Sequence, residues 1–405
     1  MTLFAAVELA PRDPILGLNE QFAADPNPAK VNLGVGVYFD DSGKLPLLAC
    51  VKAAEQQLTD AAKPRGYLPI DGIAAYDKAV QRLVFGAHPE GLAVLASGRV
   101  ATVQALGGTG ALKVGADFLK KLQPDATVLI SDPSWENHRA LFGNAGFPVG
   151  SYRYYDAENR GVRFDEMLAD LNAAKAGTIV VLHACCHNPT GYDLVPAQWE
   201  QVIAVCKARG LVPFLDMAYQ GFGDGIAEDG TVVQQFLASG QDFFVATSFS
   251  KSFSLYGERV GALSVVCQSK DEAARVLSQL KITIRTNYSN PPTHGAQVVA
   301  TVLDTPALRA QWEQELAGMR QRIKQMRQLL VEKLAVKLKA AGVEQDFGFI
   351  TRQRGMFSYS GLNKAQMERL RSEFGVYGVD SGRICVAALN SGNIDHVVAA
   401  MAKVL

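Results

Sequence analysis

The chain has 405 residues, 48% of them hydrophobic and 20% charged, which is typical of a globular protein with about two or three domains. Its 40 basic residues balance its 40 acidic ones, which argues against nucleic acid or an anionic membrane as a partner. No apolar run reaches the roughly 18 residues of a membrane span, and the first residues lack the features of a signal peptide. Six scattered cysteines do not indicate a disulfide framework, so we expect a cytoplasmic protein.

Residues 1–45 mix short elements with turns, and we assign them to an N-terminal arm and part of a small domain. Asp13-Pro14 before an apolar run predicts a short capped helix. Residues 32–38 predict a strand, in which Gly34 and Gly36 leave one face bare. That face suits either a close approach to a ligand or a simple edge strand.

Residues 46–305 form the predicted large domain, where strand-like and helical patterns alternate. Strands are predicted at 127–131, 178–183, 211–216, 243–248 and 261–266, and helices at 112–122, 135–145, 165–174, 196–209 and 231–239. This alternation predicts an α/β fold with a mainly parallel sheet flanked by helices. Ligands of such sheets bind beyond the carboxyl ends of the strands.

A long helix is predicted from Thr305-Pro306 to Ala341, with Gly342 after its end. At 1.5 Å per residue it is roughly 50 Å long, so 306–342 is expected to connect two domains. Residues 343–405 then predict a small α+β domain. Its strands are expected at 356–359, 375–379 and 384–387, and its helices at 364–374 and 394–404.

Lys251 follows a buried strand in the stretch S-F-S-K-S-F-S-L-Y-G-E-R, residues 248–259. Loss of hydration there favours the neutral amine, which attacks aldehydes to form Schiff bases. Ser248, Ser250 and Arg259 add hydroxyls and a cation that suit a phosphate. The stretch is compatible with a lysine that carries pyridoxal phosphate (PLP), and also with a solvated loop lysine.

Three further stretches are candidates for a ligand site, and the second and third of them follow predicted strands. Glycines at 107–110 precede a helix, which suits an anion or forms a plain turn; the dinucleotide pattern G-x-G-x-x-G is absent. Asp216 could pair with a pyridinium nitrogen and Tyr219 with a phenolic oxygen, or the pair could be a helix cap with a packed tyrosine. Trp135 could stack on a planar cofactor or pack in the core.

His183, Cys185 and His187 alternate along one strand face, which raises the possibility of zinc. A fourth ligand at motif spacing is missing, and buried cysteine usually packs as a small hydrophobe, so we expect no metal. Asn188-Pro189 is better explained as a rigid turn that presents the asparagine amide.

Four motifs together are highly specific: H-N-P-T-G at 187–191, S-F-S-K-x-F-S-L-Y-G-E-R-V-G at 248–261, N-Y-S-N-P-P-x-H-G-A at 287–296 and F-G-V-Y-x-x-x-S-G-R at 374–383. With them, nearly the whole chain resembles the class I aminotransferases of the aspartate and aromatic-amino-acid branch. The resemblance implies the type I fold of PLP-dependent transferases, with a mainly parallel seven-stranded sheet.

The resemblance also implies roles for individual residues. Lys251 would hold PLP and move a proton between the substrate Cα and the cofactor C4′. Asp216 would pair with the ring nitrogen, supported by His138 and His183, and Tyr219 would bond the phenolic oxygen. The implied cofactor-binding residues are Gly108, Thr109, Trp135, Asn188, Asp216, Tyr219, Ser248, Ser250, Lys251, Arg259 and, in the site of the neighbouring subunit, Tyr67.

For the substrate, the resemblance implies that Arg383 binds the α-carboxylate, with Gly36 behind it and with Trp135 and Asn188 nearby. Arg285 of the other subunit would meet a side-chain carboxylate, so the active enzyme would be a homodimer. Its substrates would be amino acids and 2-oxo acids.

The preferred amino donor depends on residues near the site entrance. Val37, Thr109 and Asn290 resemble the aspartate branch, whereas Phe39 and Leu45 resemble the aromatic one. An apolar entrance favours burial of an aromatic ring. We therefore expect transfer from both aromatic amino acids and aspartate to 2-oxoglutarate, with a strict aspartate aminotransferase as the alternative. A PLP lyase or decarboxylase, a non-catalytic PLP-binding regulator and a nicotinamide oxidoreductase are the competing classes.

Overall fold

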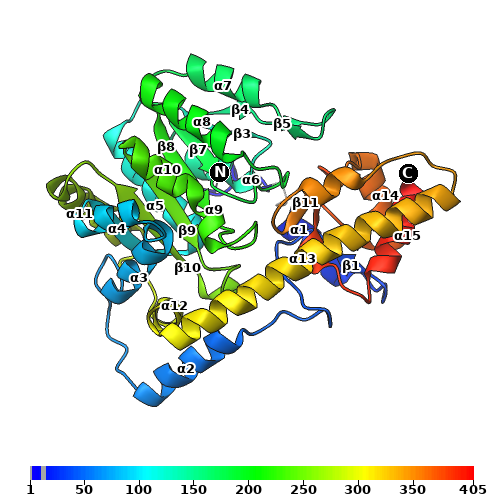
Figure 1. Cartoon of the computed structure of the whole chain (residues 1–405), viewed down its shortest axis with the longest axis horizontal. Helices are drawn as coiled ribbons and strands as arrows, with labels where there is room; N and C mark the ends of the chain where they lie inside the picture. Colours follow the sequence, from blue (N-terminus) through cyan, green and yellow to red (C-terminus); the bar gives the residue numbers. More distant parts are fainter. Residues whose placement is uncertain (1, 11–14) are drawn as a thin grey trace.

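The computed structural model describes residues 2–10 and 15–405, and a seven-stranded sheet lies at its centre (Figure 1). The order across the sheet is β2 (Val100–Leu106), β10 (Val260–Val266), β9 (Phe243–Ser248), β8 (Val212–Met217), β7 (Ile179–His183), β3 (Val128–Asp132) and β4 (Val149–Arg153). Strand β10 is antiparallel to both neighbours, and the pairs from β9 to β4 are parallel. The expected mainly parallel seven-stranded sheet is confirmed.

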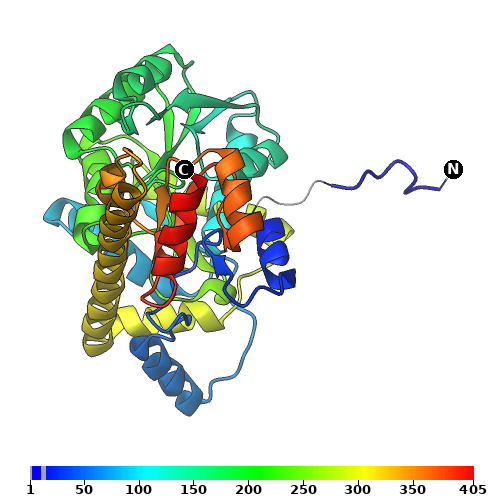
Figure 2. The same ribbon diagram turned by 90° about the vertical axis from the view of Figure 1, so that its right-hand side faces the viewer.

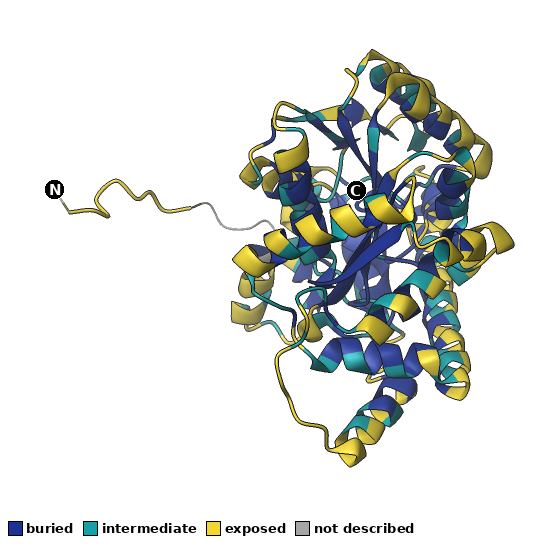
Figure 3. Cartoon of the chain, turned by 90° about the vertical axis from the view of Figure 1, so that its left-hand side faces the viewer, coloured by how far each residue is buried: buried dark blue, intermediate teal, exposed yellow. Residues whose placement is uncertain are grey.

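The strands are apolar on both faces because helices cover both faces. Val181 and Phe214 belong to the core beneath α5 (Gly107–Leu122) and α11 (Lys270–Asn287). Val180 and Leu215, one residue away on the same strands, belong to the opposite core. Helices α8 (Pro196–Arg209) and α10 (Thr231–Ser239) contribute to that second core. Figure 3 shows the sheet as a buried layer between helices whose outer faces are exposed.

The five predicted strands begin and end within one residue of the observed ones. The predicted helices at 135–145, 165–174, 196–209 and 231–239 correspond to α6 (Glu136–Asn144), α7 (Phe164–Ala173), α8 and α10. Helix α5 begins at Gly107 rather than at residue 112, because the glycine-rich stretch forms its first turn. The N-terminus of α5 therefore lies directly at the end of β2.

The prediction of a strand over 32–38 is wrong. Only Val31–Asn32 (β1) pairs in register with β12 (Val376–Tyr377). Beyond it, Leu33 donates to the Tyr377 carbonyl and accepts from Cys385, and Phe39 donates to Ala387, so the segment crosses between two partners. Of the expected short helix, α1 (Leu16–Ala24) is observed, and Asp13-Pro14 lie outside the described residues.

The long helix α13 (Pro306–Ala340) runs from the large sheet region to the C-terminal elements (Figure 1). An apolar stripe that includes Trp312, Leu316, Ile323 and Leu330 is buried along it. Gly342 has a φ of +70°, as expected for the residue after the end of a helix. The elements beyond it are β11 (Phe357–Tyr359), α14 (Lys364–Phe374), β12, β13 (Arg383–Cys385) and α15 (Ile394–Val404).

The other elements are α2 (Ala49–Ala61), α3 (Ala74–Phe85), α4 (Pro89–Ala96), β5 (Tyr155–Asp156), β6 (Gly161–Val162), α9 (Ile226–Asp229) and α12 (His294–Asp304). Short 3₁₀ turns cover Tyr256–Glu258, Gly348–Arg352 and Val386–Ala388. The first described residues extend away from the body (Figure 2). Within the described ranges, none of the helices has the length and apolar character that crossing a membrane requires.

Candidate active site

Asp216 lies at the carboxyl end of β8, opposite His183 at the end of the parallel strand β7. Its Oδ2 accepts a hydrogen bond of 2.9 Å from Nε2 of His138, a residue of α6. Because Nε2 carries the proton, Nδ1 of His138 is an acceptor for the Ser134 hydroxyl at 2.9 Å and for Nε2 of His183 at 3.4 Å. Nδ1 of His183 accepts from the backbone N–H of Asn188. A connected chain of hydrogen bonds therefore supports the carboxylate.

This hydrogen-bond network helps to set the charge of the Asp216 carboxylate. Burial alone would raise the pKa of Asp216, but the hydrogen bond from His138 and the nearby cation of Lys251 hold it below its ordinary value. Burial and the nearby His138 lower the pKa of His183 to about 3, so this ring is neutral. His187, the third residue considered for zinc, bonds to the hydroxyls of Ser131 and Thr190.

Lys251 lies in the turn that follows β9, as the sequence predicts. Its Nζ is 5.3 Å from the centre of the Tyr219 ring. Burial lowers the pKa of Lys251 to about 8; Asp216 opposes the shift, and Arg259 and Arg383 add to it. The amine therefore loses its proton far more readily than a solvated lysine does, which is the property a nucleophilic amine needs.

An anion cradle forms where β2 enters α5. The guanidinium of Arg259 donates to Ser250 Oγ at 3.4 Å and to the Tyr256 carbonyl at 2.9 Å. Among the described residues, no carboxylate forms a salt bridge with it. A Cβ at Gly107 would lie 2.6 Å from Arg259 Nη2, and a Cβ at Gly108 would lie 3.1 Å from Ser248 Cβ. The glycines thus keep open a space where a helix N-terminus and an unpaired cation meet, which fits a phosphate.

Arg383 is only 1% exposed. Its Nη1 donates to Asn188 Oδ1 at 3.1 Å and its Nη2 to the Gly34 carbonyl at 2.8 Å. The guanidinium carbon lies 4.3 Å from the centre of the Phe357 ring, and a Cβ at Gly36 would lie 2.6 Å from that ring. In the part of the chain that the structure describes, Nε of Arg383 has no partner. A buried guanidinium with a free donor fits a carboxylate ligand.

Ten of the residues predicted for the cofactor converge on one cavity. It is lined by Gly108, Thr109, Trp135, Asn188, Asp216, Tyr219, Ser248, Ser250, Lys251 and Arg259, together with Leu112, His183, Cys185 and Ala218. Asn188 Nδ2 donates to the Tyr219 hydroxyl at 3.4 Å, and the Trp135 and His138 rings meet edge to face. Sequence reasoning missed Leu112 and Ala218, although Leu112 lies three residues after Thr109 on α5, a spacing that shares a helix face.

Four predicted residues do not line this cavity: Gly36 and Arg383, whose surroundings are given above, and Tyr67 and Arg285. Tyr67 is 98% exposed, on the segment between α2 and α3. Arg285 is exposed in the last turn of α11, where its Nη1 donates to the Ser289 hydroxyl. A single chain therefore brings together the cofactor residues predicted for its own cavity, and it leaves Tyr67 and Arg285 on the surface.

The sheet and the cavity, with an amine, a carboxylate and an anion cradle, are those of a type I PLP-dependent transferase. Residues 28–401 match the family model described as aminotransferase class I and II, and the chain belongs to this family. It is therefore a PLP-dependent aminotransferase.

Named relatives cover the chain along its whole length. An aspartate aminotransferase of Pseudomonas aeruginosa is 65% identical over 100% of both chains. An aromatic-amino-acid aminotransferase of Escherichia coli K12 is 52% identical, also over 100% of both. The crystal structure of an aromatic-amino-acid aminotransferase from Burkholderia pseudomallei, covalently bound to pyridoxal phosphate, matches with a TM-score of 0.95 at 66% identity and 100% coverage of both chains.

Proposed function

We propose that the cavity binds PLP and that the enzyme transfers the amino group of aspartate and of aromatic amino acids to 2-oxoglutarate. The observation that carries this proposal is the joint placement of Lys251 and Asp216 in one cavity. Burial lowers the pKa of the Lys251 amine to about 8, whereas hydrogen bonding keeps the Asp216 carboxylate ionised. When bound, PLP supplies a ring that withdraws electrons from the substrate Cα.

In this proposal each residue of the cavity has a separate role. Lys251 would hold the cofactor through its aldehyde and would accept and return the proton of the substrate Cα. Asp216, held by His138, keeps a proton on the ring nitrogen. Asn188 and Tyr219 bond the phenolic oxygen, and Trp135 stacks on the ring. The phosphate is held by Gly108, Thr109, Ser248, Ser250 and Arg259.

Arg383 is the proposed ligand of the substrate α-carboxylate. Its free Nε and its contact with Asn188 support this role, because the substrate would lie next to the cofactor residues. Gly36 gives the Phe357 ring room to lie against the guanidinium.

We further propose a homodimer in which Tyr67 reaches the phosphate and Arg285 the side-chain carboxylate in the neighbouring subunit's site. Their exposure in the single chain supports this arrangement. A cytoplasmic location stays a prediction.

The proposed use of aromatic donors rests on the segment that follows Gly34. The Gly34 carbonyl accepts from Arg383, and Phe39, which resembles the aromatic branch, lies five residues further along the same segment and is partly buried. Aromatic side chains entering there would gain a few kcal/mol from burial of about 150 Å². The values of kcat/KM for phenylalanine, tyrosine and aspartate test this. Aromatic values about 1,000-fold below that for aspartate, or roughly 4 kcal/mol, would identify a strict aspartate aminotransferase.

Transamination itself is tested by a half-reaction. Purified enzyme mixed with aspartate and no 2-oxo acid should release one oxaloacetate per cavity and then stop. Addition of 2-oxoglutarate should restart product formation and yield glutamate. Release of ammonia or carbon dioxide over many turnovers would instead indicate a lyase or a decarboxylase.

A further inference from the structure

Asp193 lies outside the cofactor cavity, yet its carboxylate holds the backbone that leads into Asn188. Oδ2 accepts from the backbone N–H of Cys186 and Oδ1 from that of His187, both at 2.8 Å. Among the described residues, no cation lies within salt-bridge distance of Asp193. The carboxylate is thus used to bind two successive peptide groups.

The backbone that Asp193 holds is strained. Cys186 has a φ of +52°, in the left-handed region that residues other than glycine rarely adopt. Gly355 packs against it so closely that a Cβ there would lie 2.5 Å from Cys186 Cβ. Charge-assisted hydrogen bonds are among the strongest local interactions available to hold such a conformation.

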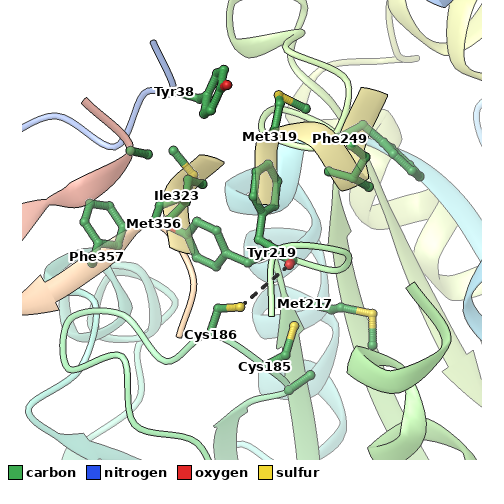
Figure 4. Close-up of a cluster of buried hydrophobic side chains, with 14 of the residues drawn as sticks. Tyr38, Cys185, Cys186, Met217, Tyr219, Phe249, Met319, Ile323, Met356 and Phe357 are labelled. Atoms are coloured by element: carbon green, nitrogen blue, oxygen red, sulfur yellow. Dashed lines mark hydrogen bonds between the residues drawn. The ribbon is translucent and has the colours of Figure 1, made fainter. Parts of the chain in front are cut away.

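This backbone determines where the Asn188 amide points. The Asn188 N–H donates to His183 Nδ1, its Oδ1 accepts from Arg383, and its Nδ2 donates to the Tyr219 hydroxyl. The Cys186 thiol also contacts the Tyr219 carbonyl (Figure 4). Asn188 therefore links Tyr219, the proposed partner of the phenolic oxygen, to Arg383, the proposed ligand of the substrate carboxylate.

We infer that Asp193 is a positioning residue that acts through Asn188 on the phenolic oxygen of bound PLP and on Arg383. The inference rests on the proposed function. A hydrogen bond to the phenolic oxygen favours its deprotonated form, so loss of that bond raises the pH at which the visible absorption of the bound cofactor changes.

The test compares Asp193→Asn with the wild type as PLP-bound enzymes. An amide of the same size accepts only through its oxygen, so one of the two backbone N–H groups loses its partner. We expect the midpoint of the absorption change to rise by about one pH unit. We also expect KM for the amino donor to rise severalfold, because Arg383 loses a fixed neighbour.

The control for the change of charge is Asp156→Asn. Asp156 also accepts from two backbone N–H groups, those of Glu158 and Asn159, here both through Oδ1, and it lies on the β5–β6 hairpin outside the residues that line the cavity. It should leave both the midpoint and KM unchanged.

A double-mutant cycle separates positioning from general loosening of the fold. In an Asn188→Ala background, Asp193→Asn should cause no further shift of the midpoint, since the group through which it acts is gone. An equal shift in both backgrounds, or no shift in Asp193→Asn alone, would overturn the inference. Failure of the wild type to bind PLP would instead refute the proposed function.

A second variant covers the case in which Asp193→Asn does not fold. Glycine adopts the left-handed backbone at position 186 without strain. The midpoint of the absorption change and KM are then compared between Cys186→Gly and Cys186→Gly/Asp193→Asn. A rise in both supports the inference, and no shift of the midpoint overturns it.

Discussion

The cofactor cavity differs from the two surface residues Tyr67 and Arg285 in one respect. The groups that tune the cavity side chains are already in place within one chain, whereas the two surface side chains have few neighbours. In the cavity, burial and neighbouring groups already shift the pKa of Lys251 and of Asp216 within one chain. Tyr67 is almost wholly exposed, and Arg285 bonds to a serine hydroxyl four residues away. The cavity is prepared by folding, whereas the surface pair would gain its surroundings from a second subunit.

The strongest test of the cavity is Lys251→Ala. Removal of the amine eliminates the attachment point and the proposed proton carrier together, so kcat/KM for aspartate should fall by at least about 10⁴-fold. Lys207→Ala, on the exposed face of α8, is the control and should retain activity. Substantial turnover by Lys251→Ala would show that another group accepts the proton.

The surface pair is tested by Arg285→Leu, alone and in mixtures. If Arg285 pairs with the side-chain carboxylate of the substrate, loss of this cation should lower kcat/KM for aspartate by about 10²- to 10³-fold, and less for phenylalanine. When Lys251→Ala and Arg285→Leu chains are dissociated and reassociated together, hybrid dimers contain one intact site if Arg285 acts across the interface. Random pairing should then restore about a quarter of the wild-type activity.

The outcome of mixing separates the two arrangements. If Arg285 served the cavity of its own chain, each site in a hybrid would lack either the lysine or the arginine. Mixtures would then remain as inactive as the separate variants, and the shared site would be refuted.

The sequence predicts those parts of the fold that depend on burial along one stretch of chain. Strands β7, β8 and β9 are apolar on both faces, and Asp216 and Lys251 follow β8 and β9 directly, so their place at one edge of the sheet is predictable. The antiparallel direction of β10 is not predictable in this way. It depends on the connection after Lys251, which is too short for a helical crossover. The hydrogen bonds of Asp193 to residues 186 and 187 come from loop geometry that no periodic pattern records.

The buried amine should also affect the stability of the cofactor-free protein. The pKa of Lys251 is lowered from 10.5 to about 8, so below pH 8 the folded state carries a charge whose burial costs about 3 kcal/mol. Between pH 8 and 10.5 the folded state has lost this proton while the unfolded state keeps it. Stability therefore rises with pH in this window.

Lys251→Met removes that cost. The free energy of unfolding of the cofactor-free variant, measured by urea, should exceed that of the wild type most at pH 7. The difference should shrink by about 3 kcal/mol as the pH approaches 10.5. A difference that stays constant from pH 7 to 10.5 would show that the amine is not desolvated.

The smallest expected effect is that of Tyr67→Phe, and it separates the two regions most directly. If the Tyr67 hydroxyl bonds the phosphate as proposed, its loss should weaken PLP binding about fivefold, equivalent to about 1 kcal/mol. The hydroxyl would act only in the neighbouring subunit's site, so the effect should be present at protein concentrations where dimers form and absent where they dissociate. Lys251→Ala should instead impair turnover at every concentration. A Tyr67→Phe effect of equal size in isolated chains would place the hydroxyl in its own cavity, where the exposure of this side chain gives it no contact.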